Sequence, residues 1–140
     1  MQQRKVEQSF KRQYYEIIDA KDMIKEELSV GTVIFNMKST MQLRNFQGTM
    51  HGGCIFASID SLVCTAVYSF DQRPVNVIKQ DVEYINAVPL EVELQVKVLV
   101  RKISKNFAFV ETVIINDNKA PHRILCRGST VLEFEQKAKL

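Results

Sequence analysis

The segment Cys54–Phe70 constrains the fold more than any other part of the sequence. Its apolar residues follow a helical spacing but leave no continuous polar face, and Asp60 is the only charged residue from Gly52 through Phe70. A helix that is apolar on every side is expected to be buried all round. The rest of the chain must therefore provide a surface that wraps around this helix.

The segments on either side of the helix alternate apolar and polar residues as β-strands do. Thr32–Lys38 and a shorter strand, Met41–Phe46, are expected before the helix. Four further strands are expected after it, namely Val75–Tyr84, Val92–Ile103, Phe107–Asn116 and Arg123–Phe134. A parallel sheet would need a crossover helix between strands, and none is indicated here. The pattern therefore predicts an α+β fold in which an antiparallel sheet wraps around one long central apolar helix.

The chain is expected to form one domain with an additional helix at its start. Apolar residues recur at three- and four-residue spacing from Val6 to Leu28, which is typical of an amphipathic helix. A length of 140 residues suits one domain, because two separate cores would each be too small. We therefore expect an N-terminal helix in residues 1–29, a globular domain in residues 30–135 and a tail in residues 136–140.

Composition and charge exclude several classes of function. Apolar residues make up 46% and charged residues 25%, as in ordinary globular proteins, and the net charge of +3 is spread without a basic block. Nucleic acid is therefore not an expected partner. No membrane span is expected, since Ser58, Asp60, Ser61 and Thr65 interrupt the apolar helix. The N-terminus lacks a secretory signal, so we expect an intracellular protein, cytoplasmic or mitochondrial.

The cysteines indicate reduced thiols rather than a disulfide framework or a metal site. Cys54, Cys64 and Cys126 are odd in number, lie in apolar surroundings and lack the CxxC spacing of zinc sites. We therefore expect no disulfide and no metal, and nothing in the sequence calls for a cofactor.

Asp60 is the first candidate for chemistry. Its neighbours at three- and four-residue spacing on a helix are all uncharged: Phe56, Ala57, Val63 and Cys64. A carboxylate buried there without a partner is costly, so it must be hydrogen-bonded, protonated or open to a cleft. Two interpretations stay open: a structural carboxylate held by a hydroxyl or backbone amide, or a general base or nucleophile with a raised pKa.

The start of the helix is the second candidate. Gly52 and Gly53 let the backbone approach a ligand, and free N–H groups of a first helical turn can polarise a carbonyl oxygen. The alternative is that the two glycines only make a tight turn. His51 is either an acid or base or a packed loop residue, and Asn45 either orients a water or caps a turn.

The spacing of these candidates has a geometric consequence. Asp60 lies eight residues past Gly52, which is about 12 Å along a helix at roughly 1.5 Å per residue. A base and the donors of an oxyanion hole must lie within a few Å of one reacting group. If both residues serve one substrate, they must come from two subunits that meet at a two-fold interface.

These residues together resemble a known family. Asn45, the run Gly48–Gly53 and then Asp60 on an apolar helix resemble the hotdog-fold acyl-CoA thioesterases of the PaaI/Them2-like branch. The resemblance runs from about Val30 to Phe134, and Tyr84 is compatible with it. It implies that residues 30–135 form a hotdog domain that hydrolyses an acyl-CoA. It also implies a homodimer or homotetramer and a place in fatty acid metabolism.

The resemblance also implies roles for single residues. Asp60 would activate water or attack the thioester carbonyl, and the amide of Gly52 would bind the carbonyl oxygen. Asn45 would position substrate or water from the opposite subunit, and His51 would complete the site. Gly53, Lys79, Arg101, Lys102 and Lys105 are candidates for substrate contact, the four cations toward the phosphates of coenzyme A, although solvated surface is the alternative for each cation.

Two positions depart from the family pattern. Val77 stands where the closest relatives have an assisting serine, and Glu91 stands where a glycine is usual. Two readings of the function follow: an acyl-CoA thioesterase, or a hotdog subunit with a silent site and a structural role in a larger, possibly mitochondrial, assembly. Asp60 favours the enzyme, because a purely structural subunit has little reason to keep a lone carboxylate on an apolar helix.

Overall fold

A computed structural model of the chain describes residues 30–116 and 123–136. The expected N-terminal helix in residues 1–29, most of the turn that begins at Asn116 and the last residues of the tail lie outside the described residues.

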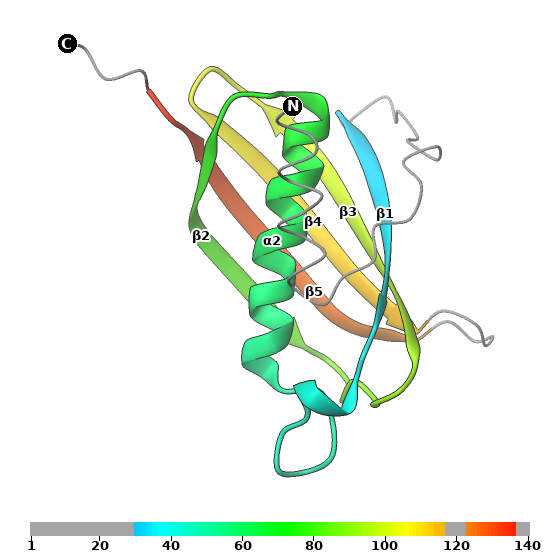
Figure 1. Cartoon of the computed structure of the whole chain (residues 1–140). Coiled ribbons are helices and arrows are strands. Elements are labelled where there is room, and N and C mark those ends of the chain that lie inside the picture. Colours follow the sequence, from blue (N-terminus) through cyan, green and yellow to red (C-terminus); the bar gives the residue numbers. More distant parts are fainter. Residues whose placement is uncertain (1–29, 117–122, 137–140) are drawn as a thin grey trace.

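The described residues form one long helix and a five-stranded antiparallel sheet. The helix is α2 (Gly52–Phe70), and the strands are β1 (Gly31–Lys38), β2 (Val75–Tyr84), β3 (Glu93–Ile103), β4 (Phe107–Asn116) and β5 (Ile124–Phe134). The strands lie in the order β1-β3-β4-β5-β2, and every neighbouring pair is antiparallel. Figure 1 shows α2 lying across one face of this sheet, with β1 and β2 at its two edges. The predicted antiparallel sheet around a central helix is therefore confirmed.

The bounds of most elements agree with the sequence pattern. β2 and β4 begin and end where alternation predicts, and the other long strands differ by one residue at their first position. The helix begins two residues earlier than expected, because Gly52 and Gly53 are already helical and His51 is the N-cap.

The expected short strand Met41–Phe46 is wrong. Met41–Leu43 form the 3-10 helix η2, and the only strand-like contact nearby is an isolated bridge between Arg44 and Met50. The alternation of apolar residues is real, but in the described part of the chain this segment joins no strand of the sheet, and the chain turns here to reach the start of α2.

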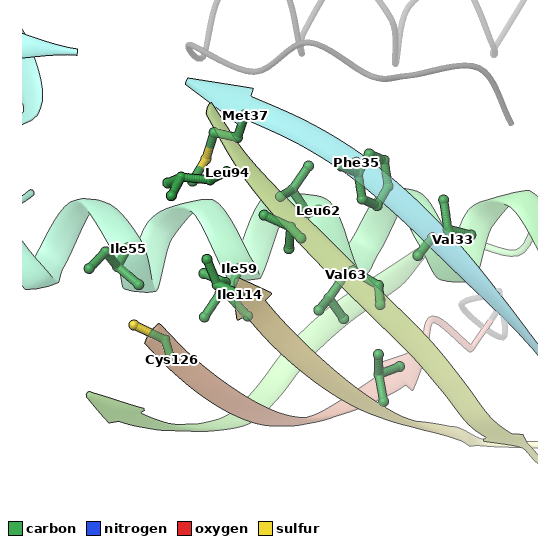
Figure 2. Packing of buried hydrophobic residues seen from close by; sticks show 14 of the residues in the cluster. Val33, Phe35, Met37, Ile55, Ile59, Leu62, Val63, Leu94, Ile114 and Cys126 are labelled. Carbon is green, nitrogen blue, oxygen red and sulfur yellow. The ribbon is translucent and has the colours of Figure 1, made fainter. Parts of the chain in front are cut away.

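The core lies between the inner face of the sheet and one face of α2. Figure 2 shows side chains of β1 and β3 facing α2. The labelled members of this cluster are Val33, Phe35, Met37, Leu94, Ile55, Ile59, Leu62, Val63, Ile114 and Cys126. Full burial of one such aliphatic or aromatic side chain stabilises the fold by about 1.5–3 kcal/mol. Gly128 brings β5 close to the helix, since a Cβ there would lie 3.4 Å from Cγ2 of Ile59.

The sequence predicted a helix that is buried on every side, and this prediction is wrong. Phe56 is 40% exposed, Ala57 is exposed, and Asp60 and Cys64 are half-buried. One five-stranded sheet covers only one side of a helix, so these residues stay accessible along the other side. By length and mean hydropathy α2 could cross a membrane, but its buried face packs on the sheet as the core helix of the domain.

A strained residue holds the start of β3 against the end of β1. Glu91 has a φ of 57°, in the left-handed region, which explains why a glycine suits this position. Its carboxylate accepts a hydrogen bond from the Met41 N–H at 2.8 Å and lies 3.8 Å from Nζ of Lys38. The hydroxyl of the buried Ser39 donates to the carbonyl of Pro89 in the same corner. Side-chain hydrogen bonds thus stabilise this corner, although its backbone conformation at Glu91 is unfavourable for a residue with a Cβ.

We predict that Glu91→Gly is more stable than Glu91→Ala by about 1 kcal/mol. Both variants lose the bond to Met41, but only alanine must keep the positive φ with a Cβ present. Urea unfolding of the two purified variants measures the difference. An alanine variant at least as stable as the glycine variant would show that the backbone is unstrained here.

Candidate active site

The loop between η2 and α2 is held together by the side chain of Asn45. Its Oδ1 accepts hydrogen bonds from the N–H groups of Gln47 and Thr49, at 2.9 and 3.1 Å. Its Nδ2 donates to Oγ1 of Thr49 at 2.9 Å. Within one chain Asn45 therefore caps its own turn, which was one of its two expected roles. The same bonds hold together the turn that precedes the start of α2.

His51 caps the N-terminus of α2. Its Nδ1 accepts from the N–H of Gly53 at 2.9 Å, while its carbonyl oxygen accepts from Cys54 and Ile55. The imidazole lies so close to Gly53 that a Cβ there would be 3.1 Å from Nδ1. A larger residue at position 53 would crowd the imidazole, and in this chain the Nδ1 atom of His51 accepts a hydrogen bond from the backbone.

The cap leaves one amide of the first turn available. In the described part of the chain, no hydrogen bond from the Gly52 N–H is found. This amide lies at the positive end of a 19-residue helix, which favours a developing negative charge. The hydroxyl of Tyr84 at the end of β2 donates to the Gly52 carbonyl oxygen at 2.9 Å. Burial raises the pKa of Tyr84, so its hydroxyl remains a donor at neutral pH.

Asp60 lies on the accessible side of α2. Burial raises the pKa of its carboxyl above the ordinary value. Among residues 30–116 and 123–136, no group donates a hydrogen bond to this carboxylate or pairs with it as an ion. The structural interpretation, a carboxylate held by a hydroxyl or amide, thus finds no partner in this part of the chain. A half-buried carboxylate with a raised pKa is suited to accept a proton.

The neighbouring thiols do not compete with Asp60 as nucleophiles. The three cysteines are free, and Cys64 stands one helical turn after Asp60. Burial first, and then the negative charge of Asp60, raises the pKa of Cys64 to about 11. Burial also raises the pKa of Cys126 to about 11. Both are protonated thiols at neutral pH and therefore weak nucleophiles.

One chain does not bring Asp60 to the Gly52 amide. Both belong to one uninterrupted helix, so the eight residues between them correspond to about 12 Å along its axis. The spacing inferred from the sequence therefore holds in the fold.

The strand β2 runs beside this stretch of helix and contributes two polar contacts. Besides Tyr84, Gln80 donates from Nε2 to the carbonyl of Phe56 at 2.9 Å. Sequence reasoning missed Gln80, because alternation alone does not show which side of an edge strand it faces. Val77 lies opposite the buried Leu132 and packs on the core, so β2 offers no hydroxyl at this position.

The expected phosphate contacts are not gathered in one place by this chain. Lys79 pairs with Asp81 at 3.5 Å, and Arg101 pairs with Glu111 at 3.0 Å. The carbonyl of Lys105 accepts from Arg73, which follows the C-terminal end of α2 and so lies far from Gly52. Lys102 lies near the end of β3 and is exposed. Within one chain these cations form no common anion site.

The fold and the site define a class of protein. A long central helix packed against a five-stranded antiparallel sheet is the hotdog arrangement. Residues 47–120, just over half of the chain, match the sequence profile of the thioesterase superfamily. The chain belongs to this hotdog-fold superfamily. No curated protein matches its sequence.

Solved structures show the same fold at low identity. Zebrafish thioesterase superfamily member 2 superposes with a TM-score of 0.72 at 20% identity, covering 94% of this chain and 97% of that one. The PaaI protein of Escherichia coli gives 0.68 at 16% identity, with coverage of 82% and 79%. An acyl-CoA hydrolase of Staphylococcus aureus, solved with butyryl coenzyme A, gives 0.71 at 17%, with coverage of 78% and 68%.

We predict that Asp60→Asn stabilises the fold at neutral pH. A carboxyl whose pKa is raised by folding contributes stability below its unfolded pKa and loses it as the pH rises through the folded value. At pH 7 the wild type therefore carries a desolvated charge that the amide lacks.

The measurement is urea unfolding of both proteins from about pH 3 to pH 8, which spans the ordinary aspartate pKa of about 3.9. The advantage of Asp60→Asn should grow as the pH rises and shrink toward the acid end. An advantage that is constant over this range would mean that the carboxylate charge is not its cause.

Proposed function

We propose that this protein hydrolyses an acyl-CoA thioester to the free acid and coenzyme A. Two features of one apolar helix carry the proposal: the Gly52 N–H, which donates no hydrogen bond within the described residues, and Asp60, whose pKa is raised by burial. Superfamily membership supports a hydrolase. The S. aureus relative holds butyryl coenzyme A, and a Streptococcus mutans relative of the same fold holds acetyl coenzyme A.

The reaction follows from the two groups. The Gly52 N–H donates to the thioester carbonyl oxygen and stabilises the negative charge that develops there. Asp60 takes a proton from a water molecule as the water oxygen bonds to the carbonyl carbon. The tetrahedral intermediate then breaks its C–S bond, the thiolate of coenzyme A leaves, and the proton held by Asp60 passes to the sulfur. Water is consumed, and one acid and one thiol are formed.

The site we propose is shared between two subunits. About 12 Å of helix separates Gly52 from Asp60 within one subunit. The Gly52 amide of one subunit would therefore bind the thioester carbonyl oxygen, while the Asp60 carboxylate that activates the water would come from the other subunit. Asn45 would reach this shared site only if part of its bonding within the loop is exchanged for substrate or water. Gly53 and the four cations remain candidates for contact with the substrate across the interface.

The edge strand β2 is the surface we propose for the dimer. No strand among residues 30–116 and 123–136 pairs with its outer side, and it presents Ile78, 51% exposed, and Ile85 just after its end, 45% exposed. Phe56 of α2 and Tyr84 of β2 add exposed aromatic surface beside them. An unpaired, apolar strand edge is a template for pairing with another chain. Figure 1 shows that this edge lies along α2, so a dimer formed there places two helices near its axis.

Thiol release from a panel of short, medium, long and aromatic acyl-CoAs tests the activity. We predict hydrolysis that depends on the acyl group, and a loss of at least 100-fold in kcat/KM for Asp60→Asn or Asp60→Ala. The matched control is Glu133→Gln, because Glu133 is exposed on β5, which lies between β4 and β2 rather than at an edge of the sheet. It should hydrolyse at the wild-type rate. Wild-type activity in Asp60→Asn would remove Asp60 from the mechanism.

Solution mass tests the dimer. We predict at least a dimer for the wild type and a shift toward the monomer for Ile78→Glu, because the substitution places a charge on the β2 edge. The control is Phe109→Glu, since Phe109 is 40% exposed on β4, which lies between β3 and β5 rather than at an edge. If Ile78→Glu keeps the wild-type mass, the dimer does not use this edge.

A second function is favoured by Val77 and Glu91. The family's serine is replaced by an apolar residue on the core, and its glycine by a residue with strained backbone. A folded dimer that releases no thiol from any acyl-CoA would point to a hotdog subunit with a structural role in a larger assembly. For either function we propose an intracellular protein, cytoplasmic or mitochondrial.

A further inference from the structure

A β-bulge changes which residues of β2 face the helix. Val77 lies opposite Leu132, and Lys79 lies opposite Val131, so Ile78 is an extra residue between two consecutive positions of β5. Gln80 then lies opposite Thr130, which is 1% exposed on the inner face of the sheet. In regular alternation from Val77, Lys79 would face inward instead. The bulge therefore turns the amide of Gln80 toward α2.

The amide of Gln80 connects the sheet to one turn of α2. Its Nε2 donates to the carbonyl of Phe56 at 2.9 Å, and its Oε1 accepts from Oγ1 of Thr130 at 3.2 Å. In an α-helix the carbonyl of Phe56 also accepts from the N–H of the residue four positions later, which is Asp60. A carbonyl oxygen has two lone pairs and can accept both bonds. Gln80 and the backbone N–H of Asp60 thus donate to the same carbonyl oxygen.

We propose that Gln80 is a positioning residue that holds the helical turn carrying Asp60 at a fixed distance from β2. This inference rests on the proposed thioesterase function. The apolar contacts that bind α2 to the sheet have little directional preference, so they leave the helix able to slide or rotate slightly. Tyr84 fixes the helix at Gly52, and Gln80 fixes it one turn further, next to Asp60. Together the two bonds set the height and rotation of the carboxylate.

The loss of the hydrogen bond between Gln80 and Phe56 is expected to lower kcat strongly, although the shift in the position of Asp60 is small. A shift of about 1 Å in a reacting group can lower a rate by about 100-fold. A loosened helical turn occupies the productive position only part of the time, so a smaller loss is expected. Because Gln80 acts on the carboxylate and not on the substrate, kcat should fall while KM stays constant.

Gln80→Met is the decisive variant, because methionine keeps the length of the side chain and removes both polar atoms. We expect kcat to fall about tenfold with KM within twofold of the wild type. The matched control is Thr130→Val, which removes the bond between Thr130 and Gln80 but leaves the donor to Phe56 in place. It should keep the wild-type kcat. Wild-type kcat in Gln80→Met would overturn the proposal.

A double-mutant cycle separates positioning from general damage to the fold. If Gln80 acts only through Asp60, Gln80→Met should cause no further loss in a protein that already carries Asp60→Asn. A structural defect would instead lower the residual rate by the same factor in both backgrounds. An equal factor in both would overturn the positioning role.

Hydrogen exchange provides a readout that does not depend on activity. The amide of Asp60 should exchange several-fold faster in Gln80→Met than in the wild type or in Thr130→Val, while the amide of Val67, two turns further along, stays unchanged. Unchanged exchange at Asp60 would refute the tether even in an active enzyme. A wild type without hydrolysis but with this exchange pattern would instead refute the proposed function and leave the tether established.

Discussion

The packing of α2 on the inner face of the sheet is the interaction on which the rest of the structure depends. Apolar side chains along one side of the helix, such as Ile59 and Leu62, are completely buried against the strands. Burial of apolar surface is strong but has little direction, so it holds the helix on the sheet without defining its exact rotation. The polar bonds at the helix periphery supply that definition: His51 and Tyr84 at its start, and Gln80 one turn further.

The same packing explains the properties of the two candidate catalytic groups on this helix. The sheet covers one side of α2 and leaves Asp60 half-buried on the other, where loss of water raises its pKa. The positive end of the helix dipole lies at Gly52, and the His51 cap accepts from the N–H of Gly53 rather than from that of Gly52. Both features cost stability, since a carboxylate without a partner and an unbonded amide are unfavourable. The catalytic roles that we propose for Asp60 and for the Gly52 amide would account for these two unfavourable features.

A single chain is incomplete in two respects that point to the same solution. In the described part of the chain its helix is accessible along the side that carries Phe56 and Asp60, and its edge strand β2 has no partner strand on its outer side and presents large apolar side chains. The two chemical groups are also too far apart to act on one carbonyl within one subunit. The two-fold pairing along β2 that we propose would cover the exposed surface and would bring Gly52 of one subunit toward Asp60 of the other.

The sequence by itself determined α2, the five long strands and the chemical candidates, because these depend on local patterns. Alternation defined β2 and β4 to the residue, and the apolar run defined α2, with Asp60 and Gly52 on it. Pattern failed at Met41–Leu43, where a correct alternation has no neighbouring strand and the chain forms η2. The tertiary structure alone decided the strand order and the bulge at Ile78 that turns Gln80 inward. The physical reason is that these depend on pairing between distant segments, and alternation of side chains records which face is buried but not which strand lies alongside.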